Sequence, residues 1–290
     1  SGKLDLYITP RHPLYVPDAA ALAAAVWHES QDEVFAADSM RRITVKVPVP
    51  EQERSYYLAA VVTHKGDKPV VSQRVFRAVN PSKRAAALKG RRVVVFGADE
   101  TVSAFLTRHG CTVDQGLTDG RVEGDVVLIV DATKLSNAER QAATGSLRAF
   151  AESGGRIVVL DQTKWDWKEL ADCVIGLPEF EWINPVTCSR AHAHEGVEHA
   201  MLRDIPKDWL WRWNGLPGEI VNEVLMEGPA LEQGRKLLWA SKPDYTAALA
   251  VPVGKGEIVF SQLHIRRRIN PSGEAYDPVA ERVLVNLLGP

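Results

Sequence analysis

Two aspartates, Asp131 and Asp161, directly follow apolar runs with the composition of buried β-strands. Because the carboxyl ends of neighbouring parallel strands meet at one edge of a sheet, the two carboxylates could lie close together. Paired carboxylates can exchange protons with a substrate or bind a cation, and with His264 they would form a hydrolytic site. An aspartate in this position can equally cap the next helix or terminate the sheet, so both interpretations stay open.

Tryptophan is concentrated in one third of the chain, which holds six of the eight. The densest stretch runs from Asp208 to Gly215. If it is extended, Trp209, Trp211 and Trp213 share one face. Exposed rings stack on the apolar faces of sugars or anchor protein interfaces, whereas buried rings fill a seam between layers. We therefore expect Trp209, Trp211, Arg212 and Trp213 to form a carbohydrate or protein contact, with burial in the core as the alternative.

Two histidines, His192 and His194, stand two positions apart. On a strand they would point to the same side, which is the geometry that a pair of metal ligands needs. No third ligand is evident, although His199 or His264 could be proposed, and an exposed polar strand is the alternative. The three cysteines are far apart and form no C-x-x-C pair, so neither a zinc framework nor a disulfide scaffold is indicated.

The turns after the apolar runs lack the patterns of cofactor binding and covalent catalysis. Gly97 is followed by Asp99 and Glu100, whose carboxylates would repel a phosphate at a helix N-terminus, and Asp99 is better interpreted as a helix cap. The stretch Asp161-Gln162-Thr163-Lys164 has no Ser or Cys between flanking glycines. We expect no nucleotide or other cofactor.

Residues 91–290 have the pattern of an α/β domain. Apolar runs at 92–97, 125–130 and 156–160 alternate with helical segments at about 100–109 and 136–153, which predicts a doubly wound parallel sheet. Further apolar runs cover 236–240, 247–251 and 257–261, and a helix is expected over about 278–288.

Residues 1–80 are expected to form an all-β, immunoglobulin-like sandwich, followed by a linker at 81–90. Short β-rich runs cover 4–8, 22–27, 43–49, 55–63 and 70–78, and the last two are predicted to form a hairpin. The alanine-rich residues 18–26 break this pattern because alanine favours a helix.

Composition excludes several classes of function. The 290 residues carry 35 Lys and Arg against 37 Asp and Glu, a net charge of −2, which argues against a nucleic-acid partner. No apolar run approaches the roughly 20 residues that cross a bilayer. The N-terminus lacks a signal-peptide pattern, and Ser1-Gly2-Lys3 looks like a cleavage scar, so we expect a piece of a longer protein.

Four stretches of the second domain carry a family resemblance: 92–97, 147–160, 253–263, and 199–206, which reads His-x-x-Leu-x-x-Ile-Pro. On these, residues 91–289 resemble the flavodoxin-like sheet of the class I glutamine-amidotransferase superfamily, particularly its non-catalytic members. Active amidotransferases carry a Cys at the elbow and a His-x-Glu pair. This sequence has Asp161-Gln162-Thr163 and His264-Ile265-Arg266 instead, so the resemblance implies that glutaminase chemistry is absent.

An immunoglobulin-like module ahead of such a domain resembles the C-terminal region of large bacterial, β-galactosidase-like glycoside hydrolases. The resemblance implies a non-catalytic accessory region that serves oligomerisation, structural support or glycan contact. Its implied partners are an upstream catalytic domain of the same polypeptide, a second copy of the chain, and a glycan. It suggests a periplasmic or extracellular location and leaves a cytoplasmic one open. The alternative is a hydrolase in its own right that uses Asp131, Asp161 and His264.

Overall fold

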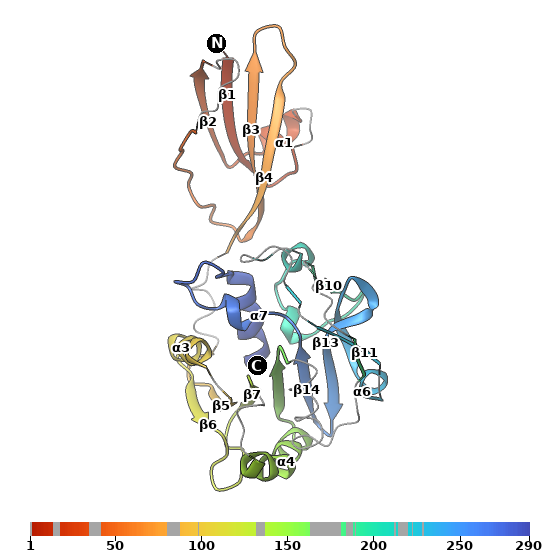
Figure 1. The fold of residues 1–290 in the computed structure, drawn as a ribbon. Helices are drawn as coiled ribbons and strands as arrows, with labels where there is room; N and C mark the ends of the chain where they lie inside the picture. Colours follow the sequence, from red (N-terminus) through yellow and green to blue (C-terminus); the bar gives the residue numbers. More distant parts are fainter. Residues whose placement is uncertain are drawn as a thin grey trace. The chain divides into compact units, whose positions relative to one another are not determined.

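The computed structural model divides the chain into two compact units, Ser1–Asn80 and Pro81–Pro290, each with its own sheet (Figure 1). The structure describes residues 2–13, 18–34, 42–79, 88–97, 99–131, 137–162, 181–183, 188, 190–211, 213, 220–221, 223–227 and 229–290.

The first unit is a four-stranded antiparallel sheet with strand order β2-β1-β3-β4. Its elements are β1 (Gly2–Thr9), α1 (Ala19–Ala23), β2 (Trp27–Glu33), β3 (Arg54–His64) and β4 (Val70–Ala78). The predicted hairpin is present as β3 and β4, and its turn contains Gly66 at a φ of +89°. The alanine-rich segment forms α1, as alanine propensity predicts. Ile8, Tyr56 and Ala78 form a small core.

Two features of this unit differ from the expectation. Residues 43–49 were expected to be a strand, but they lie in no strand or helix, and Val49 is exposed. The alternation of apolar residues there describes a side-chain pattern, but a strand also needs a partner for its backbone hydrogen bonds. Within the described residues the unit therefore has one sheet, not the two of a sandwich. Strand β2 is polar and lies at an edge of the sheet, so its sequence contains no apolar run that would predict a strand.

The second unit is an α/β domain on a mixed sheet, with its main path in the order β10-β12-β13-β14-β8-β7-β5-β6. Strands β6, β5, β7, β8 and β14 run parallel, and β10, β12 and β13 extend the sheet with antiparallel pairing. The strands are β5 (Arg92–Phe96), β6 (Thr112–Gln115), β7 (Val126–Ile129), β8 (Arg156–Leu160), β9 (Glu181–Ile183), β10 (His192–Ala193), β11 (Val224–Glu227), β12 (Arg235–Ala240), β13 (Lys242–Val253) and β14 (Gly256–Ser261).

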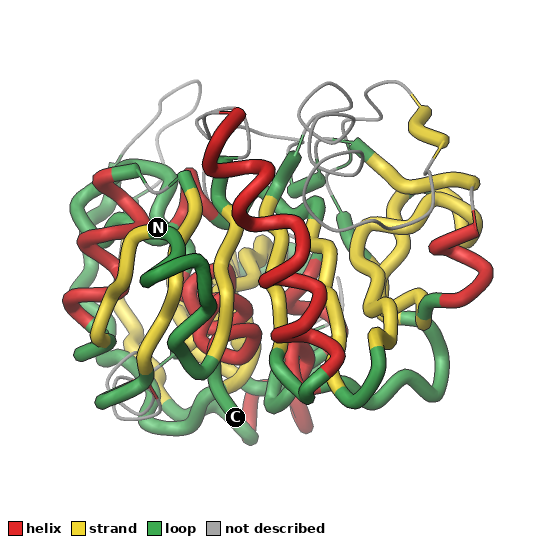
Figure 2. Tube along the Cα trace, turned by 90° about the horizontal axis from the view of Figure 1, so that it is seen from below, coloured by secondary structure: helices red, strands yellow, loops and turns green. Residues whose placement is uncertain are grey.

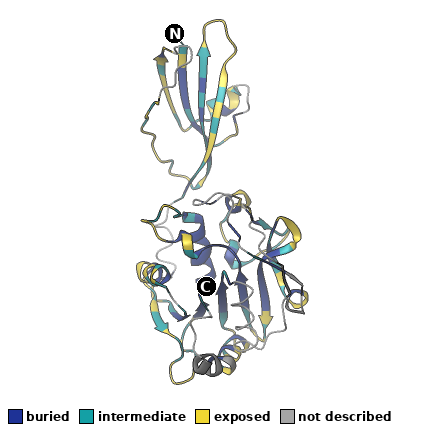
Figure 3. Cartoon of the chain, in the orientation of Figure 1, coloured by how far each residue is buried: buried dark blue, intermediate teal, exposed yellow. Residues whose placement is uncertain are grey.

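The central strands are covered on both faces, because consecutive residues of β7 and β8 are buried (Figure 3). Helix α4 (Asn137–Glu152) packs on one face through Ala143, Leu147 and Ala151. The other helices are α3 (Glu100–Arg108), α6 (Pro229–Gln233) and α7 (Pro278–Leu288), with short 3-10 helices η4 (Ala200–Leu202), η5 (Lys207–Leu210) and η6 (Arg266–Arg268) (Figure 2). In the described part of the chain, no helix is both long and apolar enough to span a membrane.

Candidate functional site

The structure brings together two of the three residues of the predicted hydrolytic site. Strands β8 and β14 are parallel neighbours that end at the paired residues Leu160 and Ser261. Asp161 follows β8 directly, and its Oδ2 lies 2.8 Å from Nδ1 of His264. Both side chains are buried, with exposed fractions of 9% for Asp161 and 4% for His264. Asp161 has a φ of +37°, which is unusual for a residue with a side chain and marks a tight turn.

Asp131 lies one strand away, after the end of β7, and is partly exposed. Its backbone is in close contact with Gly97, which has a φ of +68°. The predicted cap is confirmed at the neighbouring strand, where Asp99 accepts a hydrogen bond from the Val102 N–H at 2.8 Å. The ends of β5, β7 and β8 thus each present an aspartate at the same edge of the sheet.

Polar side chains close this edge by bonding to its backbone. The amide of Gln162 donates to the carbonyl of Val130 at 3.0 Å, and Gln262 donates to the carbonyl of Gln162 at 2.9 Å. Arg266 also donates to Val130, at 2.7 Å, and its guanidinium lies 3.8 Å from Asp99. Side chains of the protein itself therefore bond to the backbone at the described ends of β7 and β8, the edge at which ligands bind in open α/β sheets.

The Asp161–His264 pair has the orientation of an acid–base pair. A carboxylate at Nδ1 favours the tautomer that leaves Nε2 with a lone pair for proton abstraction. The second carboxylate oxygen of Asp161, Oδ1, is buried and has no hydrogen-bond partner within the part of the chain that the structure describes. Such an atom can be satisfied by a buried water.

The described start of the tryptophan segment forms the 3-10 helix η5 and is not extended, so the condition for one shared face is not met there. Trp209 lies in η5 with 1% of its surface exposed, and Trp213 is also buried and donates from Nε1 to the carbonyl of Trp209 at 3.0 Å. The guanidinium of Arg282 lies 5.1 Å from the ring centroid of Trp209. The turn of η5 rotates alternate side chains to different sides, and only Trp211 of these three is exposed, at 40%. Arg212 lies outside the described residues.

Trp211 belongs to a surface that the sequence did not reveal. Its ring centroid is 5.8 Å from that of His192, and His192 stacks on Trp239 at 4.2 Å with an interplanar angle of 15°. The pairing of β10 with β12 places His192 opposite Trp239. This contact joins residues far apart in the sequence, and only the strand pairing shows it.

Of the histidine pair, His192 lies in β10 and His194 directly follows this strand. Burial, and then the charge of Arg190, lowers the pKa of His192, and burial with the charge of Lys236 lowers that of His194. Neither suggested third ligand joins them, because His199 contacts Glu257 and His264 contacts Asp161. Among the described residues, no group of three His, Cys, Asp or Glu side chains is placed to hold a metal ion.

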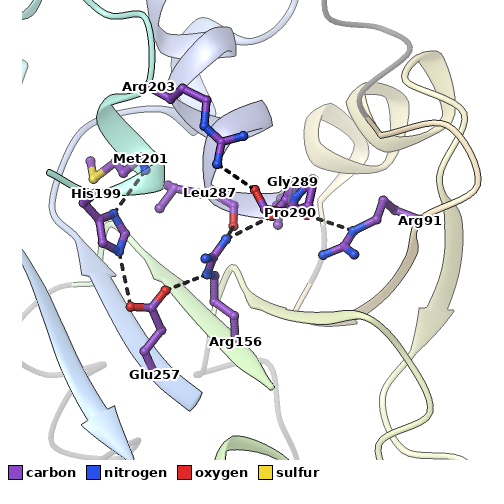
Figure 4. Close-up of polar contacts among 10 residues, drawn as sticks. Arg91, Arg156, His199, Met201, Arg203, Glu257, Leu287, Gly289 and Pro290 are labelled. Carbon is purple, nitrogen blue, oxygen red and sulfur yellow. Dashed lines mark hydrogen bonds and ion pairs between the residues drawn. The ribbon is translucent and has the colours of Figure 1, made fainter. Parts of the chain in front are cut away.

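A second polar cluster holds the end of α7 (Figure 4). Glu257 lies between His199 and Arg156, at 3.3 and 2.7 Å, and Arg156 donates to the carbonyl of Gly289 at 2.9 Å. Hydrogen bonding from His199 outweighs burial and, with Arg156, lowers the pKa of Glu257 to about 2. Arg203 donates to the carbonyl of Pro290 at 3.1 Å. A local sequence pattern does not show this cluster, because its members come from distant segments.

No protein-family model and no curated protein matches this sequence. Among solved structures, a cold-adapted β-galactosidase from Rahnella sp. R3 has a TM-score of 0.36 and 15% identity, over 61% of this chain and 29% of that one. A β-galactosidase from Bacillus circulans sp. alkalophilus has a TM-score of 0.37 and 12% identity, over 69% of this chain and 30% of that one. PurLQS from Thermotoga maritima has a TM-score of 0.43 and 11% identity, over 69% of this chain and 98% of that one. The chain spans less than a third of either β-galactosidase.

Proposed function

We propose that this chain is a non-catalytic accessory region of a carbohydrate-active enzyme and that it contacts glycan through Trp211. The observation that carries the proposal is the exposure of this ring. Among the described residues of the second unit, Trp211 is the one exposed large apolar side chain, while Trp209 and Trp213 are buried. Tryptophan is highly buried on average, and an exposed indole offers a flat apolar face to the C–H face of a sugar.

The carboxyl edge of the sheet supports the non-catalytic part of the proposal. Gln162 and Arg266 both donate to the carbonyl of Val130, which directly follows β7. These two side chains cover the described end of β7. In this proposal the accessory region comprises a β-rich, immunoglobulin-like module at 1–80, a linker at 81–90 and an amidotransferase-like domain at 91–290. Its partners are an upstream glycosidase domain of the same polypeptide and, through the same exposed face, a second copy.

Calorimetry against a panel of neutral and acidic oligosaccharides tests glycan contact. We expect heat with at least one glycan, and Trp211→Ala should weaken that binding about tenfold, because it removes the stacking face. Trp211→Phe keeps a ring and should retain most of the affinity, and Val75→Ala, at an exposed site in the first unit, should change nothing. Two results together would refute both contact roles, glycan binding and contact with a second copy. These are no heat with any glycan, and self-association that Trp211→Ala leaves unchanged.

A hydrolase is the second candidate, and the 2.8 Å contact between Asp161 and His264 favours it. In that case Nε2 of His264 would take a proton from water, and Asp131 at the adjacent strand end would face the substrate. This hypothesis predicts turnover of an ester or glycoside that Asp161→Asn abolishes. Inactivity of the wild-type chain across a broad substrate screen would count against it.

A further inference from the structure

The sheet of the first unit ends in two strands, β2 and β4, whose outer edges pair with no other strand among the described residues (Figure 1). Every pairing within this sheet is antiparallel, so β2 and β4 run in opposite directions. A second copy placed beside the first in the same orientation therefore continues the antiparallel pattern, with its β2 next to β4 of the first copy.

The two edges differ in charge. On β2, Glu29 and Asp32 are exposed, whereas β4 has no acidic residue and its Arg74 is exposed. Opposite charges that face each other across neighbouring strands attract, and like charges repel. Two β4 edges or two β2 edges therefore disfavour each other, while β4 of one copy and β2 of another are complementary.

Neighbouring charges preserve this complementarity. Lys3 on β1 is paired with Asp32 in the sheet, but its ammonium lies 3.3 Å from a carboxylate of its own strand. The turn before β4 adds exposed Lys65 and Lys68. The one carboxylate of this turn, Asp67, is bonded to the end of β3 at 2.9 Å. The positive sign of the β4 edge thus continues into the turn.

Apolar side chains are exposed along the same two edges. Val70 and Val75 of β4 are 65% and 51% exposed, and Val26, directly before β2, is also exposed. β4 is nine residues long and pairs with β3 without a bulge. Long, regular edges with apolar side chains pair with further strands, whereas protected edges are short, bulged or charged throughout. The length, regularity and valines of β4 therefore favour pairing.

The register of the sheet brings the complementary side chains to one face. The pairs across the sheet join Trp27 of β2 to Arg74 of β4 through one row of residues on β1 and β3. Glu29 is two residues from Trp27, and Phe76 is two residues from Arg74, so all four share a face. In the antiparallel register that sets Arg74 opposite Glu29 of a second copy, Phe76 is opposite Trp27 of that copy. Both rings are partly buried against the core of the unit, so this register makes the apolar layer continuous.

We propose that the first unit binds a second copy of this chain by strand addition, with β4 of one copy against β2 of the next. Backbone hydrogen bonds supply affinity, and the pairing of Arg74 with Glu29 selects the partner edge and the register. The contact joins two different surfaces, so copies assemble head to tail, as an open series or as a ring. It lies in the first unit and is independent of the glycan contact proposed for Trp211.

Sedimentation velocity of the full chain over a range of protein concentrations, at low and at moderate salt, tests this contact. We expect concentration-dependent association that weakens as salt rises. Arg74→Glu and Glu29→Lys each set like charges against each other, so each variant alone should associate about fivefold more weakly. An equimolar mixture of the two variants should associate like the wild type, because alternating copies restore opposite charges at every contact. Arg121→Glu and Glu274→Lys, at exposed sites of the second unit, are the matched controls.

Several outcomes would overturn strand addition. A wild-type chain that stays monomeric at its highest soluble concentration is one, and association that both charge reversals leave unchanged is another. Association that weakens in Arg74→Glu but not in Glu29→Lys would show that β4 meets a surface other than β2. Association that Trp211→Ala abolishes and the charge reversals leave intact would place the second copy at the second unit. That last result would support the contact role of Trp211 while overturning this proposal, so the two are tested separately.

Discussion

Gly97 occupies the point where β5 leaves the sheet, and its backbone passes against the carbonyl of Asp131. A Cβ at this position would collide with that carbonyl, and the φ of +68° adds strain for any other residue. We expect Gly97→Ala to lower the free energy of unfolding by about 3 kcal/mol, because the backbone of two strands must move apart. Gly116→Ala has a similar φ of +73° with open space around it, so it should cost only about 1 kcal/mol. Urea unfolding measures both, and equal losses would show that the carbonyl contact is unimportant.

Glu257 should give the protein an acid-sensitive contribution to stability. Its pKa in the folded state is about 2, below the ordinary value of 4.5, so the folded state favours the ionised form. The stabilisation is fully present above pH 4.5 and is lost as the pH falls toward 2. Its size is at most about 3 kcal/mol, reduced by the partial exposure of the carboxylate.

The variant Glu257→Gln isolates this contribution. We expect it to be less stable than the wild type at pH 7, because His199 and Arg156 lose the carboxylate, and the difference should shrink toward pH 2. Urea unfolding of both proteins across this range measures the difference directly. A difference that stays constant with pH would mean that the ion cluster at the end of α7 contributes through packing alone.

At the scale of elements, one buried carboxylate fixes α3 to α7. Glu281 lies 2.8 Å from His109 and 3.2 Å from Arg108, and these contacts outweigh its burial and lower its pKa. We expect Glu281→Ala to cost about 3 kcal/mol, because it leaves His109 buried without its partner. Glu152→Ala removes an exposed pair with Arg148 on α4 and should cost less than about 0.5 kcal/mol. Hydrogen exchange should quicken in α3 only in the first variant, and equal behaviour of the two variants would contradict this role for Glu281.

Elements with a strong pattern of their own were predictable, and contacts between distant elements were not. The apolar runs before Asp161 and Gly97, and the amphipathic helix at 278–288, follow from local composition. The sequence also predicts that Asp161 and His264 belong to one site, because the carboxyl ends of parallel strands lie at one edge of a sheet. Polar β2, the 3-10 turn that buries Trp209, and the stacking of His192 on Trp239 depend on tertiary partners, which a local pattern does not specify.

At the scale of the whole molecule, each unit has its own sheet and its own core, so we expect them to unfold separately. The first unit, with a core centred on Ile8, Tyr56 and Ala78, buries little apolar surface and should melt first. Scanning calorimetry of the full chain should show two transitions. Ile8→Ala should lower the temperature of the first transition only, and Leu128→Ala, in buried β7, should lower that of the second only. Each substitution should lower the unfolding free energy of its own unit by about 2–5 kcal/mol. A single transition that shifts with both substitutions would show that the two cores unfold as one cooperative unit.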